Sequence, residues 1–144
     1  MRSRYASAAV ALASIMAASG ATANPLGIPP TARPFDVVEG KTISIELGTP
    51  TAHGWYVLVW GGYKVGDREF LANGSAKEGE FNPGAGCVYI AWTGGGQCFF
   101  PSEGQGNKAH EFLKPIHGGP PITLGFVPPA GAHGVFYYRV DNAP

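Results

Sequence analysis

The chain has 144 residues, of which only 14% are charged, and its ten Lys and Arg residues balance ten Asp and Glu residues. A formal net charge of zero excludes the strongly basic surface of a typical nucleic-acid-binding protein, so nucleic acid is not expected as a partner. Three Trp, six Tyr and eight Phe exclude a disordered chain, because disordered sequences are poor in aromatic residues.

The first 23 residues have the features of a secretory signal peptide. Arg2 and Arg4 precede the apolar run Ala6–Ala18, and Ala21-Thr22-Ala23 is a small-x-small cleavage site. We expect cleavage after Ala23, which leaves 121 residues with 8 basic and 10 acidic side chains. No later run is long enough to cross a bilayer. The sequence therefore predicts a secreted, extracellular protein, or a periplasmic one in a bacterium, without a membrane partner after cleavage.

The mature chain divides into a lead-in and one domain. The segment 24–34 has four prolines in eleven residues and is expected to be extended and polyproline-like. From residue 35 to residue 144, short runs of β-branched and aromatic residues alternate with Gly, Pro and Asn. The runs expected to form strands are Thr42–Leu47, Trp55–Trp60, Val88–Trp92, Gln97–Phe100, Glu111–Lys114, Ile122–Val127 and Val135–Val140.

No segment has a convincing helical pattern, so the sheets must cover each other in a sandwich or a small barrel. We favour an all-β, two-sheet antiparallel β-sandwich of seven to nine strands. The run Trp55–Trp60 is apolar on both faces. One face carries Tyr56, Leu58 and Trp60, and the other carries Trp55, Val57 and Val59. The strand either lies centrally under a covering layer or offers one of these faces to a partner.

Four segments resemble strands B, C, E and F of an immunoglobulin-like sandwich. They are Glu39–Leu47, Trp60 thirteen residues later, Ile122–Phe126 and Gly134–Tyr138. In this resemblance, Leu47 and Tyr138 stand where antibody-type domains have their bridging cysteines. The resemblance implies a fold but no single function. The spacing also favours a terminal hairpin between Ile122–Val127 and Val135–Val140, joined by Pro128–Gly134.

Cys87 and Cys98 are expected to form a disulfide, because two lone cysteines rarely stay reduced in an oxidising compartment. A four-residue turn at Thr93–Gly96 would place Cys87 roughly 13 Å from its partner, beyond disulfide reach. A turn centred on Trp92-Thr93 would bring the cysteines face to face, and an open loop with Cys87 outside the strand would also permit the bond. We favour the disulfide, which places Trp92 at a loop tip, available to a ligand.

Asn73 begins the sequon Asn73-Gly74-Ser75, which predicts a glycosylation site in a eukaryotic secretory pathway and only a turn in a bacterium.

Four histidines, His53, His110, His117 and His133, provide an alternative function, a small metal-binding or redox domain. Their spacing matches no compact metal motif, so we expect solvated loop histidines. The segment 98–106 is similar to the cysteine loop of cupredoxins, although Ser102 stands at the position of that family's ligand histidine. Such a site would also need an unpaired thiolate.

Catalytic signals are weak. The sequence has no Gly-x-Ser-x-Gly motif, and the carboxylate pairs Glu78 with Glu80 and Asp67 with Glu69 are expected on solvated faces. We therefore expect neither an enzyme nor a cofactor.

The number of large aromatic rings exceeds what one small core readily buries, so some rings should be exposed. Exposed Trp and Tyr rings stack on sugars or fill partner pockets. The candidate ligand-binding residues are Trp92, Trp60, Tyr56 and Tyr89. The sequence thus predicts a non-enzymatic module that binds a carbohydrate or a protein surface, with a host-facing or cell-wall-associated role.

Overall fold

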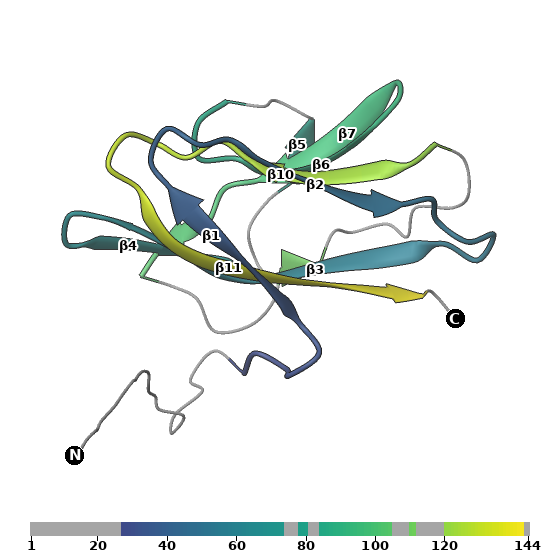
Figure 1. Cartoon of the computed structure of the whole chain (residues 1–144), viewed down its shortest axis with the longest axis horizontal. Helices are drawn as coiled ribbons and strands as arrows, with labels where there is room; N and C mark the ends of the chain where they lie inside the picture. Colours follow the sequence, from purple (N-terminus) through teal and green to yellow (C-terminus); the bar gives the residue numbers. More distant parts are fainter. Residues whose placement is uncertain (1–26, 74–77, 81–83, 105–109, 112–119, 143–144) are drawn as a thin grey trace, which may run out of the picture.

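The structure, a computed structural model, describes residues 27–73, 78–80, 84–104, 110–111 and 120–142 (Figure 1). The predicted signal peptide lies outside these residues. The described part of the chain forms eleven strands and no helix. In chain order they are β1 (Arg33–Val38), β2 (Ile43–Gly48), β3 (Trp55–Val65), β4 (Arg68–Leu71), β5 (Glu78–Glu80), β6 (Val88–Trp92), β7 (Gly95–Phe99), β8 (Ser102–Glu103), β9 (His110–Glu111), β10 (Ile122–Phe126) and β11 (His133–Asn142).

The strands form two antiparallel sheets, which Figure 1 shows as two layers. Sheet 1 has the order β1-β11-β3-β4-β8, and β9 also pairs with β3. Sheet 2 has the order β2-β10-β6-β7-β5. The predicted all-β sandwich is confirmed. Nine of the described strands have three or more residues, while β8 and β9 have two each.

The predicted terminal hairpin is wrong, because β10 and β11 lie in different sheets. Pro128 and Pro129 follow β10 and have no N–H to donate to a ladder, and a turn closed by the Ala132 N–H and the Pro129 carbonyl at 3.1 Å leads into β11. Strand β2 pairs with β10 and β3 pairs with β11, as B pairs with E and C with F in immunoglobulin-like sandwiches. The arrangement is consistent with that fold at a coarse level. Strand β1 occupies the edge of sheet 1 beside β11.

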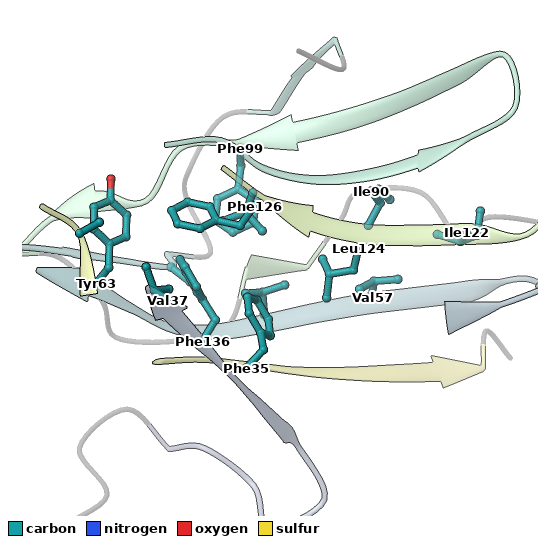
Figure 2. Packing of buried hydrophobic residues seen from close by; sticks show 14 residues of the cluster. Phe35, Val37, Val57, Tyr63, Ile90, Phe99, Ile122, Leu124, Phe126 and Phe136 are labelled. Atoms are coloured by element: carbon teal, nitrogen blue, oxygen red, sulfur yellow. The ribbon is translucent and has the colours of Figure 1, made fainter. Parts of the chain in front are cut away.

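Aromatic rings from both sheets form the centre of the core (Figure 2). Phe126 of sheet 2 meets Phe136 of sheet 1 edge to face, with ring centroids 5.0 Å apart. Tyr63 lies 5.3 Å from Phe126, and Phe35 stacks on Phe136 at 5.3 Å. Towards the other end of the sandwich the core is aliphatic and includes Val57, Val59, Ile90, Ile122 and Leu124. The sheets are thus joined by packing of apolar side chains.

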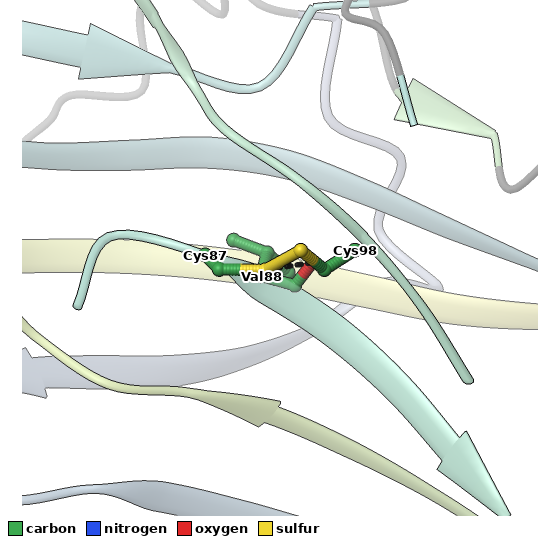
Figure 3. Close-up of a disulfide and its surroundings, with 3 residues drawn as sticks. All are labelled: Cys87, Val88 and Cys98. Carbon is green, nitrogen blue, oxygen red and sulfur yellow. Dashed lines mark hydrogen bonds between the residues drawn. A yellow bond between two sulfur atoms is a disulfide. The ribbon is translucent and has the colours of Figure 1, made fainter. Parts of the chain in front are cut away.

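The Cys87–Cys98 disulfide is present and joins Cα atoms 5.9 Å apart (Figure 3). Neither of the two strand registers expected from the sequence occurs. Trp92 pairs with Gly95 across a two-residue turn in which Gly94 has a φ of 92°, a conformation that favours glycine. Cys98 lies opposite Tyr89, and Cys87 forms the bond from just outside β6, which is the open-loop alternative.

We expect removal of this disulfide to lower the free energy of unfolding by roughly 3 kcal/mol at most, because the bond restricts the unfolded chain and the shortness of the loop that it closes limits this effect. The double substitution Cys87→Ala and Cys98→Ala tests this by urea unfolding, with the reduced wild-type chain as a second comparison. An unchanged unfolding midpoint in both would contradict the expectation.

An exposed ion pair links β4 to β8. The Arg68 guanidinium donates from Nε and Nη2 to the two carboxylate oxygens of Glu103, at 3.0 and 2.9 Å. These hydrogen bonds lower the pKa of Glu103 below its ordinary value and raise that of Arg68.

The lowered pKa of Glu103 gives a pH-dependent contribution to stability. It is present above the ordinary glutamate pKa of 4.5 and is lost as the pH falls through the lowered value in the folded chain. Carboxyl-detected NMR titration should find the pKa of Glu103 below 4.5, and Arg68→Ala should return it to that value. Equal values in the two proteins would show that the pair does not form in solution.

Candidate functional site

The strand register determines which side chains lie on the outer face of sheet 1. In β3, Val57 and Val59 point into the core, so Tyr56, Leu58 and Trp60 point outward. Residues directly opposite each other in antiparallel strands project to the same face. Tyr137 of β11 lies opposite Trp60 and therefore joins it on this outer face.

A hollow of about 330 Å³ lies on this face where glycine replaces side chains. Gly62 of β3 lies between Val135 of β11 and Leu71 of β4 in one cross-strand row. A Cβ on Gly62 would overlap the carbonyl oxygen of Phe70, so the position admits only glycine unless the backbone shifts. The hollow is lined by Ile28, Gly61, Gly62, Tyr63, Lys64, Glu69, Leu71, His133, Gly134, Val135 and Tyr137.

The aromatic side of the hollow is Tyr137, whose side chain is half-buried. The neighbouring Trp60 is only 7% exposed, and the Arg139 guanidinium lies 5.5 Å from its ring centroid. Arg139 is held in place by two 2.8 Å hydrogen bonds to Asp141 and one of 3.1 Å to Thr31. The accessible ring at the hollow is therefore that of Tyr137.

The opposite side of the hollow is a charged row. His133, Lys64 and Glu69 lie opposite one another on β11, β3 and β4, and all three are exposed. His133 Nδ1 lies 3.3 Å from the carbonyl oxygen of Gly131, to which it can donate a hydrogen bond. The other ring nitrogen, Nε2, is not used in that hydrogen bond. The hollow thus combines an apolar floor and a ring with donors and acceptors along one side.

The core residue Tyr63 contributes to the wall of the hollow from below. Burial raises the pKa of its hydroxyl, and the nearby Arg68 offsets part of that rise. Its ring stacks on Phe70 at 5.1 Å, so Tyr63 supports the site through packing.

The four predicted ligand-binding residues do not form one site. Tyr56 and Trp60 share the outer face of sheet 1, where Tyr56 is half-buried. Tyr89 is 9% exposed and lies beside the disulfide, over Gly125, where any Cβ would overlap its ring. Trp92 ends β6 half-buried against the main core, so it does not stand free at a loop tip.

The histidines are also dispersed. His110 is 2% exposed and stacks on Phe99 with ring centroids 3.9 Å apart, and its Nδ1 lies 3.1 Å from the Asn73 carbonyl oxygen. The expectation of a solvated loop histidine is wrong at this position, because strand β9 turns the ring into the core. His53 and His133 are exposed, and His117 lies outside the described residues.

The described residues contain no group of three or more His, Cys, Asp or Glu side chains that could hold a metal ion. Both cysteines are joined in the disulfide, so neither offers the thiolate of a cupredoxin site.

The other candidate positions are only partly described. Asn73 is half-buried, and the rest of its sequon lies outside the described residues. Glu69 belongs to the charged row, and Asp67 is exposed in the turn before β4. The side chains of Glu78 and Glu80 lie outside the described part.

Comparison of this chain with protein-family models, with curated proteins and with solved structures finds no match. Among the described residues, no helix is long and apolar enough to cross a membrane.

We expect Gly62→Ala to lower the free energy of unfolding by about 3 kcal/mol or more, because the added methyl group must displace backbone. Gly40→Ala is the matched control. Gly40 has open space around its Cβ position but a φ of 81°, so only conformational strain of about 1 to 2 kcal/mol is expected there. Urea unfolding that ranks the two variants equally would contradict the close approach at Gly62.

Proposed function

We propose that this chain is a secreted, non-enzymatic binding module that recognises a saccharide at the hollow on the outer face of sheet 1. The observation that carries the proposal is the combination of the Gly62 hollow, the ring of Tyr137 at one side and the charged row at the other. As in the prediction from the sequence, an aromatic ring contacts the carbohydrate, but the ring is that of Tyr137 at the hollow.

The chemistry of a sugar ring matches these features. A pyranose has an apolar face of C–H groups, which packs on a flat aromatic ring, and a rim of hydroxyls, which both donate and accept hydrogen bonds. Lys64 donates, Glu69 accepts, and the imidazole of His133 adds a polar ring nitrogen. A volume of about 330 Å³ is at the lower end of small-molecule sites, so it suits one or two sugar units.

The fold and the disulfide are compatible with this role. The Cys87–Cys98 bond agrees with an extracellular or other oxidising environment, as the predicted signal peptide requires. We further propose that the sandwich is immunoglobulin-like, on the basis of the β2–β10 and β3–β11 pairings. Such a scaffold presents sites on its faces without determining which ligand is bound.

A glycan array probed with the mature chain tests the proposal, followed by calorimetric titration of the best ligand. We expect Tyr137→Ala to weaken binding about tenfold, which corresponds to loss of roughly 1.4 kcal/mol of ring contact, whereas Tyr137→Phe should retain most of the affinity.

Phe100→Ala is the matched control, because Phe100 is an exposed ring, 55% accessible, that does not line the hollow. Absence of binding to every glycan, or equal losses in Tyr137→Ala and Phe100→Ala, would overturn the proposal.

A further inference from the structure

Strand β2 is a sheet edge that is regular from Ile43 to Glu46 and has one register shift against β10, between Glu46 and Gly48. It lies at the end of sheet 2, and among the described strands it pairs only with β10. Edge strands usually avoid edge-to-edge pairing by being short, by carrying Pro or Lys, or by being covered. The other described edges use these devices: β1 contains Pro34, and β5, β8 and β9 have three residues or fewer. Strand β2 has six residues, Ile43–Gly48, and contains neither Pro nor Lys.

The core side of β2 is incompletely covered. Ile43, Ile45 and Leu47 pack against the main core but remain only half-buried. The pairing of β1 with β11 ends at Tyr138, so no described strand continues sheet 1 beyond residues 139–142 on that side. A groove of about 410 Å³ remains between the sheets there, lined by Thr31, Arg33, Glu46, Leu47, Tyr138, Arg139 and Val140.

The sequence of β2 is complementary to itself in the antiparallel direction. Ile43-Ser-Ile-Glu-Leu47 alternates apolar and polar residues and reads as the same pattern from either end. With a two-fold axis at Ile45, Ile43 would lie opposite the partner's Leu47, and Ser44 opposite the partner's Glu46. A shift of one residue would place apolar side chains opposite polar ones, so the pattern excludes registers shifted by an odd number of residues.

We propose that β2 pairs with β2 of a second copy of this chain, antiparallel about a two-fold axis, so that the two five-stranded sheets form one continuous sheet. The apolar stripe then continues across the interface. A hydroxyl faces a carboxylate on the exposed side, and no like charges lie directly opposite each other. The mature chain expected after cleavage has 8 basic and 10 acidic side chains, a net charge of 8 − 10 = −2, so long-range repulsion between the copies is weak. A two-fold interface of this kind is closed and stops at a dimer.

This dimer is independent of the proposed saccharide site. The pairing uses the edge of sheet 2, whereas the hollow lies on the outer face of sheet 1. The edge variants below therefore test the dimer without altering any residue that lines the hollow.

Sedimentation equilibrium of the mature chain over a concentration series tests the dimer. The double substitution Ser44→Lys and Glu46→Lys places like charges opposite each other in the proposed register, and both residues are exposed, so the monomer should still fold. We expect dimerisation to weaken at least tenfold, and circular dichroism checks the fold. The matched control adds the same two lysines to the other long edge, through Asp36→Lys and Val38→Lys on exposed positions of β1, and should leave the dimer intact.

Hydrogen exchange provides a second measurement. The β2 amide N–H groups that point away from β10 should exchange more slowly as the protein concentration rises, because in the dimer they donate hydrogen bonds to β2 of the second copy. A wild-type chain that stays monomeric throughout the series overturns the proposal. A dimer that the β1 control weakens as much as the β2 variant, or that the β2 variant leaves unchanged, also overturns it.

Discussion

The two sheets are held together at the edge-to-face contact between Phe126 and Phe136. The packing of one sheet on the other determines which side chains point outward, and therefore where the hollow lies. The rings come from consecutive strands, β10 and β11, and their centroids lie 5.0 Å apart. With no helix among the described residues, each sheet can bury its apolar face only against the other. The chain crosses between the layers after β10 instead of closing a hairpin, which places Phe126 and Phe136 in opposite sheets. This crossing gives the pairing of β2 with β10 and of β3 with β11.

Once Phe136 points into the core, the alternation of a strand determines the rest of the outer face of sheet 1. Its neighbours Val135 and Tyr137 must point outward, and the register places them beside Gly62 and Trp60. The glycine at position 62 then has two consequences. It permits the close approach of β4, whose Phe70 carbonyl occupies the space of a Cβ, and it leaves the outer face hollow at the centre of a row of side chains. A packing requirement thus creates the site.

The sequence predicted the fold class because its apolar runs alternate or are β-branched, and β6 was predicted with its observed bounds, Val88–Trp92. Strands β1 and β4 were missed because Pro34 interrupts the first, and two of the four residues in the second, Arg68 and Glu69, are charged. These strands form through pairing with β11 and β3, which no local pattern reveals.

The burial of His110 was also missed, because it depends on the pairing of β9 with β3 and not on a local pattern. Of the two faces that the sequence left open for Trp55–Trp60, the register places Tyr56 and Trp60 on the outer face, and Tyr137 of the hollow was identified only by the register. The one local signal was Gly61-Gly62 inside an apolar run, since glycine within a strand often marks a close approach.

The same architecture separates the two surfaces to which we assign different roles. The outer face of sheet 1 carries the ring and charges to which we assign a small polar ligand, while the β2 edge of sheet 2 carries a self-complementary side-chain pattern and is followed by no other described strand. Pairing through β2 would give one particle two hollows at a fixed separation. For a ligand displayed in many copies on a surface, binding of the second hollow becomes intramolecular, and avidity can exceed the affinity of a single site by about 10² to 10⁴. In such a dimer, a shallow hollow with one accessible ring would be sufficient for stable attachment, because the hollow of the second copy would supply a second point of contact.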